Sequence, residues 1–298
     1  MSDMMIKNLP DRSTVKAHLD ESAFLRYCRL IDWFKDEERS VIALSGGVDS
    51  SVVAAAALIS QGASALAVTS NSSTFTALDL ADAENLAKSI GIRHLVVNVD
   101  DPNNSGFINN SPERCFYCRE ELVKVLAKVA AKESSGSIVD GMNTDDLVGH
   151  RPGIMALRNG GVRSPLIECG IGKAEVRNIA RALGLPSADK PSNACLASRF
   201  PYGETISKDK MDKVAQAEEL VKVITGAKQV RVRHHGDIAR IEVGKDERNS
   251  FFNESLMDSV HTRLKEIGYN YVSLDLAGYR NGSMDETLEL TAIPSKSG

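Results

Sequence analysis

Residues 41–51, with the sequence VIALSGGVDSS, combine the end of a buried strand, a glycine turn and the start of a helix. The first four residues are apolar, and residues 52–59 (VVAAAALI) form an apolar run typical of a helix. Paired glycines let the backbone turn tightly and approach a ligand without an intervening side chain. The N–H groups at the helix start and the hydroxyls of Ser45, Ser50 and Ser51 then face one anion. This stretch therefore predicts a phosphate-binding loop.

The loop differs from the Walker sequence G-x-x-x-x-G-K-[ST] because the lysine is missing. A tight turn with a good helix cap is the alternative, but a cap needs one hydroxyl and this stretch offers three together with Asp49. SGGVDS resembles the signature of the PP-loop ATP pyrophosphatases, which split ATP into AMP and pyrophosphate to activate a substrate as its adenylate. The resemblance implies catalysis by Asp49 through Mg²⁺, and ATP contacts by Ala43, Ser45, Gly47, Val48, Asp49, Ser50 and Ser51.

Length and composition indicate an ordinary enzyme of about two domains. The 298 residues are 42% hydrophobic and 26% charged, and the net charge of −4 gives no general attraction to nucleic acid. The longest apolar run, residues 52–59, is eight residues long, whereas a membrane-spanning helix needs ~20. Residues 1–20 also lack an apolar signal core. We therefore expect a cytoplasmic protein without a membrane segment.

Strands and helices alternate over the first part of the chain. Strands are expected at residues 41–44, 65–69, 94–99, 137–140 and 162–165. Helices are expected at residues 14–38, 51–61, 78–90, 118–133 and 173–183. This alternation predicts an α/β domain over residues 1–200, with a parallel sheet covered on both faces and ligands at the carboxyl ends of its strands.

The pattern changes after Tyr202. A helix, a hairpin, a second helix and a last strand are expected at residues 207–224, 230–233 with 238–243, 255–267 and 271–276. This order predicts a small α+β domain over residues 201–290 that serves the substrate or oligomer assembly. We expect residues 291–298 to be a disordered tail.

Polar loops follow two of the expected strands. Thr69 and Ser70 end the second strand, beside the phosphate loop in a parallel sheet, and can hold adenine or ribose. Residues 140–146 (DGMNTDD) can hold a ribose, a magnesium ion or only their own turn. The corresponding loop helps to close the nucleotide site in PP-loop enzymes, so Asn143 and the nearby Arg151 become candidate ATP contacts.

The five cysteines fall into two kinds. Cys28 and Cys169 are isolated and are expected to pack in the core. Cys115 and Cys118 form a C-x-x-C at a helix start, where thiolates are favoured, and Cys195 lies in a loop leaving the α/β domain. A structural zinc site needs four ligands, whereas three cysteines suit a 4Fe–4S cluster with one open iron. Spacing alone leaves a redox dithiol or unliganded thiols as equal alternatives.

Five longer motifs narrow the resemblance. They are ERCFYC, NTDD-x-x-x-x-RPG, SPL, DKPS-x-ACLASRFPYG and RVR-x-H-G-x-x-ARIEV, and with SGGVDS the similarity runs from about residue 40 to residue 243. Together they resemble the LarE family of ATP-dependent sulfur transferases of nickel-pincer nucleotide cofactor biosynthesis. The resemblance implies that ATP adenylates a carboxylate on a pyridinium mononucleotide and that sulfur then replaces AMP.

Two branches of that family differ in the source of sulfur. One has only the cysteine of the ACLASR motif and gives up that residue's own sulfur, leaving dehydroalanine. The other has the extra C-x-x-C and is thought to hold a 4Fe–4S cluster that carries a sulfide on its open iron. The presence of Cys115, Cys118 and Cys195 implies the cluster branch, with an external sulfide donor and with Cys195 also catalytic.

The second domain carries the expected substrate contacts. Arg231 and Arg233 alternate on one strand and share a face, and two adjacent arginines suit a phosphate. A solvated strand face is the alternative without the resemblance. With it, the implied catalytic residue beside Cys195 is Ser198, and the implied substrate contacts are Arg199, Glu219, Arg231, Arg233 and Glu242. A homo-oligomer is also expected.

Two other functions remain open at this point. The net negative charge and the lack of paired C-x-x-C knuckles argue against a tRNA-thiolating PP-loop enzyme. A nucleotide-binding sensor with a structural metal would bind ATP without releasing AMP.

Overall fold

The protein is described by a computed structural model that covers residues 9–99, 104–147, 152–191, 195–280, 282–284 and 286. The chain forms two compact units. The first comprises Met1–Asn104 and Glu113–Asn193, and the second comprises Ser105–Pro112 and Ala194–Gly298. The second unit thus begins before the expected boundary at residue 200, and it takes in a segment that the sequence assigns to the first domain. The expected disordered tail, residues 291–298, lies outside the described residues.

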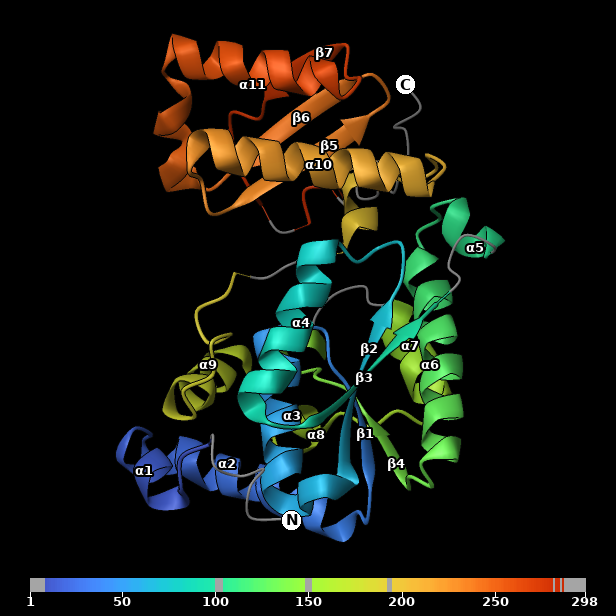
Figure 1. Cartoon of the computed structure of the whole chain (residues 1–298), viewed down its shortest axis with the longest axis vertical. Coiled ribbons are helices and arrows are strands. Elements are labelled where there is room, and N and C mark those ends of the chain that lie inside the picture. Colours follow the sequence, from blue (N-terminus) through green and yellow to red (C-terminus); the bar gives the residue numbers. More distant parts are fainter. Residues whose placement is uncertain are drawn as a thin grey trace, which may run out of the picture. The chain divides into compact units, whose positions relative to one another are not determined.

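The first unit has a four-stranded parallel sheet in the order β3-β2-β1-β4 (Figure 1). Its strands are β1 (Ser40–Ala43), β2 (Ala65–Asn71), β3 (Arg93–Asn98) and β4 (Ser137–Val139). Its helices are α1 (Arg12–Ala17), α2 (Glu21–Trp33), α3 (Val48–Gln61), α4 (Ala77–Ile90), α6 (Arg114–Lys132), α7 (Pro152–Asn159), α8 (Pro165–Glu168) and α9 (Lys173–Ala182). The predicted α/β class with a parallel sheet is confirmed.

Helices cover both faces of this sheet, because alternate strand residues point to opposite sides. Ile42 and Ala67 belong to the core shared with α2, α3 and α9. Val41 and Val68 face the other way and pack with Leu126 of α6. Figure 1 shows α3 and α6 on opposite sides of the strands. The carboxyl ends of β1 and β4 are left for loops that can meet a ligand.

The bounds of two expected elements of the first unit are wrong. The single helix at residues 14–38 is divided into α1 and α2, because the Asp20 side chain caps a new helix by accepting from the N–H of Ala23 at 2.8 Å. The strand at residues 162–165 is reduced to one bridge between Arg163 and Val139. It stops there because Pro165 has no N–H to pair and instead begins α8.

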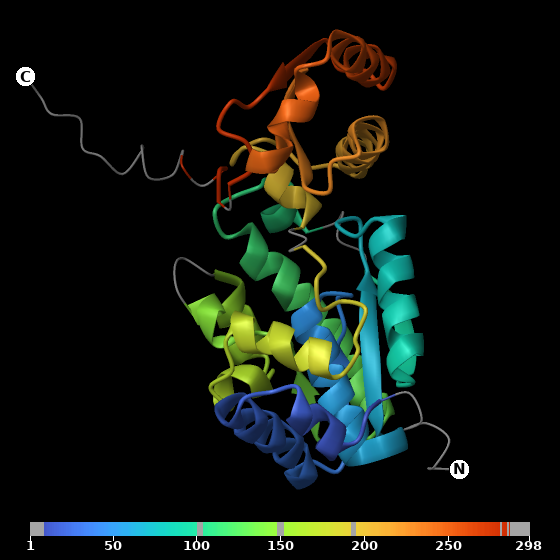
Figure 2. The same ribbon diagram turned by 90° about the vertical axis from the view of Figure 1, so that its left-hand side faces the viewer.

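The second unit contains the short helix α5 (Ser105–Ile108) and an α+β fold. Its other elements are α10 (Lys208–Thr225), β5 (Val230–His235), β6 (Ile238–Val243), α11 (Glu254–Glu266) and β7 (Tyr271–Leu274). β5 and β6 form an antiparallel hairpin, and β7 joins β6 in parallel after the α11 crossover. Val232 and Ile241 pack with Val221 of α10 and Leu264 of α11. Figure 2 shows both helices on the same side of this sheet, so its other face is available for polar side chains.

None of the helices in the described part of the chain is long and apolar enough to cross a lipid bilayer.

Candidate active site

The phosphate loop lies where the strand order reverses, between β1 and β4, which is where ligands bind in open α/β sheets. Gly46 has a φ of +74°, a conformation that glycine adopts without strain. Gly141, which follows β4, approaches the start of α3 so closely that a Cβ there would lie 2.6 Å from the N atom of Ser50. The loops after β1 and β4 therefore form one surface around the N-terminus of α3.

Ser45, Gly47 and Ser50 form the turn itself. The Ser50 hydroxyl accepts from the N–H of Ser45 at 3.2 Å and donates to the carbonyl of Gly47 at 3.2 Å. The two serine hydroxyl oxygens are also 3.2 Å apart. Gly47 caps α3 without a side chain, and Val48 is its first residue. This arrangement leaves the first N–H groups of a 14-residue helix without an intrahelical partner, and such groups favour anions.

The hydroxyls of two predicted ATP contacts, Ser51 and Thr69, already have hydrogen-bond partners in the protein. The Ser51 hydroxyl is buried, lying 2.7 Å from the Val48 carbonyl and 2.7 Å from the Ser187 hydroxyl. The Thr69 hydroxyl donates to the Leu44 carbonyl at 2.7 Å and lies 2.8 Å from His94 Nε2. These two hydroxyls hold the loop in place in this structure. Ala43 and Ser70 lie near the carboxyl ends of β1 and β2 and are partly buried.

Asp49 connects three segments of the first unit. One carboxylate oxygen accepts from the Asn143 amide at 3.0 Å, and the other contacts the Lys173 ammonium. The Lys173 N–H in turn donates to Asp145 at 3.0 Å. The predicted pair of Asp49 and Asn143 is thus brought together. Lys173 was missed, and its position at the start of a helical pattern gave no sign of a contact with a loop more than a hundred residues earlier.

A second lysine lies against the phosphate loop. The Lys190 ammonium donates to the Gly46 carbonyl at 3.1 Å and forms an ion pair with Asp82 at 2.7 Å. With Lys173 on Asp49, two ammonium groups flank a loop that has no lysine of its own. They can screen the negative charge of a triphosphate or of departing pyrophosphate.

The loop after β4 makes its own turns, as one of the sequence alternatives requires. Asp140 accepts from the N–H of Met142 at 3.0 Å, and Asn143 accepts from the N–H of Asp145 at 2.9 Å. Burial raises the pKa of the Asp140 carboxyl. Arg151, a predicted ATP contact, lies outside the described residues.

Cys115 and Cys118 lie in the first turns of α6, which begins at Arg114 and therefore includes both thiols. Residues three apart share a helix face, and Cys115 is exposed while Cys118 is partly buried. Gly153 lets α7 approach this turn, since a Cβ there would lie 3.3 Å from the Cys115 carbonyl oxygen. Two thiols on one face at a helix N-terminus are suitable metal ligands.

Cys195 belongs to the second unit and is exposed. It precedes the 3₁₀ helix η5 (Leu196–Arg199). The Ser198 hydroxyl donates to the Cys195 carbonyl at 2.8 Å, and the Arg199 guanidinium donates to the same carbonyl at 3.1 Å. Ser198 and Arg199 therefore fix the backbone that carries the thiol.

Glu218 anchors this turn to the sheet. Its carboxylate accepts from Arg199 at 2.7 and 3.1 Å and from the N–H of Val232 at 3.1 Å. Both charged side chains are almost fully buried. Although burial lowers the pKa of Arg199, the carboxylate of Glu218 raises it, and the net pKa lies above its usual value. The predicted contact Glu219 is exposed. Its substrate contact stays a prediction, and it points away from the adjacent Glu218 because an α-helix turns by about 100° per residue.

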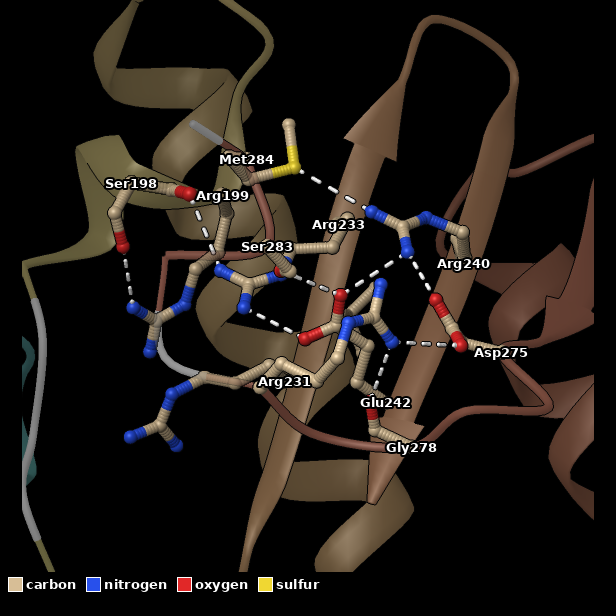
Figure 3. Close-up of polar contacts among 12 residues, drawn as sticks. Ser198, Arg199, Arg231, Arg233, Arg240, Glu242, Asp275, Gly278, Ser283 and Met284 are labelled. Carbon is tan, nitrogen blue, oxygen red and sulfur yellow. Dashed lines mark hydrogen bonds and ion pairs between the residues drawn. The ribbon is translucent and has the colours of Figure 1, made fainter. Parts of the chain in front are cut away.

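The arginine face, defined as Arg231, Arg233, Arg240 and Glu242, lies on the side of the hairpin away from α10 and α11 (Figure 3), where all but Arg240 are buried. The register pairs Arg231 with Glu242 and Arg233 with Arg240, so all four side chains share that side. Glu242 accepts from Arg233 at 2.6 Å and pairs with Arg240 at 3.1 Å. Arg233 also donates to the Ser198 carbonyl at 3.2 Å, which joins this face to the turn of Cys195.

The electrostatics of this face favour an anion. Burial lowers the pKa of Arg231, and the positive charges of Arg199 and Arg233 lower it further. The Nε atom of Arg233 is buried without a hydrogen-bond partner among the described residues. A phosphate or carboxylate would relieve the mutual repulsion and accept these hydrogen bonds.

Glu218 can be tested by its effect on stability. Replacing Glu218 by Gln leaves the buried Arg199 without its ion pair, and we expect a loss of about 3–5 kcal/mol in the free energy of unfolding. Glu219→Gln, the adjacent exposed position, should change it by no more than about 0.5 kcal/mol. Urea unfolding followed by circular dichroism measures both variants. Equal losses from the two would contradict the anchoring role.

The comparisons with known proteins extend beyond the loop. The family model described as NAD synthase matches residues 34–128, which contain the phosphate loop and the C-x-x-C. An uncharacterized protein of Synechocystis is 39% identical over 259 residues, covering 87% of this chain and 96% of its own length.

A protein of Lactiplantibacillus plantarum called pyridinium-3,5-bisthiocarboxylic acid mononucleotide synthase is 36% identical over 262 residues. That match covers 87% of this chain and 93% of the relative. A tRNA-specific 2-thiouridylase of Rickettsia peacockii is more distant, with 27% identity over 209 residues and 56% coverage of both chains.

Proposed function

The chain belongs to the LarE family of PP-loop, ATP-dependent sulfur transferases, and on that premise we propose that it converts a carboxylate of a pyridinium mononucleotide into a thiocarboxylate. The name of the Lactiplantibacillus relative supports this acceptor. The arginine face of the second unit supports it independently, because a mononucleotide carries the phosphate that such a face would bind.

In the first step, the substrate carboxylate attacks the α-phosphorus of ATP and releases pyrophosphate. A carboxylate resists substitution until one oxygen becomes part of a good leaving group, and AMP is that group. The N–H groups at the start of α3 would bind the phosphates, with Lys173 and Lys190 nearby. Asp49 and Asn143 would hold Mg²⁺, whose charge stabilises the departing pyrophosphate.

In the second step, sulfur attacks the acyl carbon and expels AMP. We propose that Cys115, Cys118 and Cys195 are the ligands of a 4Fe–4S cluster, which would supply a sulfide from its open iron. The paired thiols on α6 suit this donor set. The chain's own contribution is to hold Cys195 through Ser198 and Arg199, while the arginine face holds the acceptor.

We include a cytoplasmic location in the proposal, because an odd number of cysteines, five, argues against a disulfide framework. The sulfide donor and the homo-oligomer stay predictions.

The arginine face gives a direct test of the acceptor. In the double variant Arg231→Ala/Arg233→Ala we expect affinity for the pyridinium mononucleotide to fall at least about 100-fold, since charge-assisted hydrogen bonds are lost. ATP affinity should stay unchanged, because the phosphate loop belongs to the other unit. Isothermal titration with each ligand measures both effects.

Arg263→Ala is the matched control, because Arg263 is an exposed arginine of α11 in the same unit. If ATP affinity falls as much as mononucleotide affinity, the assignment of ATP to the first unit and of the mononucleotide to the second is wrong.

Filter binding with tRNA over a range of salt concentrations tests the alternative function, tRNA thiolation. High affinity with a steep negative salt slope would favour tRNA thiolation.

A further inference from the structure

We propose that the ring of Tyr279 is the platform on which the cationic pyridinium ring of the acceptor stacks while the arginine face holds its phosphate. This inference rests on the proposed function and adds a residue that binds the ring. Tyr279 follows β7 and is partly exposed. No sequence motif or residue spacing indicated a function for this tyrosine.

The backbone fixes this tyrosine next to the hairpin. Gly278 has a φ of +70°, and a Cβ there would lie 2.8 Å from the Val243 carbonyl oxygen. Only glycine therefore lets the chain turn so close to the end of β6. The Tyr279 N–H then donates to the same carbonyl at 2.8 Å. Gly278, labelled in Figure 3, thus lies against Val243, the residue that follows Glu242 in β6.

The segment around this turn is anchored on both sides. Asp275 donates its N–H to the Ile241 carbonyl at 2.8 Å and binds Arg240 through its carboxylate. Arg280 donates to the Gly278 carbonyl at 3.0 Å, and Ser283 donates to Glu242 at 2.8 Å. The backbone that carries the aromatic ring is thus held by a network that includes the arginine face itself, which limits the entropy lost when a ligand stacks on the ring.

The Tyr279 ring already contacts a cationic side chain. The guanidinium carbon of Arg231 lies 5.6 Å from the Tyr279 ring centroid, within the range of a cation–π contact. The phenol is also close enough to Arg199 to raise the pKa of that buried group, against the lowering effect of burial. Tyr279 therefore lies beside the arginine assigned to the phosphate.

These contacts specify the class of ligand. A phosphate would draw the Arg231 guanidinium onto itself, because a full negative charge attracts it more than a ring quadrupole does. The ring face would then take another flat cation, and a pyridinium ring is both flat and positively charged. A sugar phosphate without the ring would gain only the arginine contacts.

Two probes separate the ring from the phosphate in the full-length protein. Nicotinate mononucleotide has both groups, and ribose 5-phosphate has the phosphate alone. In the unaltered protein, titration calorimetry should give about tenfold tighter binding of nicotinate mononucleotide. Tyr279→Leu should remove that preference and leave the affinity for ribose 5-phosphate unchanged. Tyr279→Phe keeps a ring and should keep the preference.

Tyr271→Leu is the control, since Tyr271 is an exposed tyrosine of β7 in the same unit. A Tyr279→Leu protein that keeps the tenfold preference would overturn the platform. Loss of affinity for both probes in that variant would also overturn it, because Tyr279 would then only support the fold of the face. The failure of the proposed function looks different: Arg231→Ala/Arg233→Ala would leave both affinities unchanged. An unaltered protein that binds neither probe overturns both.

Discussion

Replacing Asp49 by Asn is expected to lower the rate of AMP and pyrophosphate formation by about 100-fold without disturbing the fold. The carboxylate lies in the first turn of the helix that the phosphate loop opens. Asparagine keeps the size of the side chain and one oxygen for Asn143, but it removes the negative charge that would attract Mg²⁺. Release of radiolabelled pyrophosphate measures the effect, and circular dichroism checks the fold.

The contact between Asp49 and Lys173 sharpens this experiment. When ATP and Mg²⁺ bind, the metal would compete for the carboxylate and the ammonium would move to the phosphates. We therefore expect Lys173→Met to lower the rate as well, and Asp49→Asn/Lys173→Met to lower it by less than the product of the two single effects. Full additivity would mean that the two residues act separately.

Asp189→Asn is the matched control, because Asp189 is a highly exposed carboxylate of the same unit. It should leave the rate unchanged. Normal turnover in the Asp49→Asn variant, with a normal circular dichroism spectrum, would remove Asp49 from the active site.

Local sequence patterns predicted most elements of the first unit, because short stretches of sequence determine where these elements begin and end. An apolar run, two glycines and an alanine-rich helix place β1, the loop and α3 within a few residues of their bounds. Errors arose where a single side chain ended an element. Asp20 caps a new helix within an apolar periodic stretch, and Pro165 converts an expected strand into a helical turn. The short helices α5, α7 and α8 have at most eight residues, too few for a clear period.

Contacts between distant residues could not be predicted in this way. The strand period put Arg231 and Arg233 on one face, and the hairpin register adds Arg240 and Glu242 to it. The role of Glu218 depends on the rotation of α10 about its axis, and the sequence indicated only its neighbour Glu219. Lys173 and Tyr279 reach their sites only through tertiary structure. Sequence periodicity therefore predicts which face a residue occupies, but not the partner it meets there.

Cys115→Ala, Cys118→Ala and Cys195→Ala are each expected to abolish both the brown colour of anaerobically purified protein and its sulfur transfer. A cluster with three protein ligands is lost or loosened when one thiolate is removed, because the iron left behind becomes exposed. All three variants should still bind ATP, since the phosphate loop is a separate stretch of chain. Iron and acid-labile sulfide assays, with absorbance spectra, measure the cluster directly.

Cys28→Ala and Cys169→Ala are the controls, and both should keep the colour and the activity. Cys169 is buried, and burial raises the pKa of its thiol to about 11, so it is a poor metal ligand. The sacrificial alternative predicts that only Cys195 matters and that mass spectrometry after turnover finds this residue lighter by one H₂S. The redox-dithiol alternative predicts that Cys115 and Cys118 matter together in a colourless protein. An active protein without iron would overturn the cluster, and an intact Cys195 after many turnovers would overturn the sacrificial reaction.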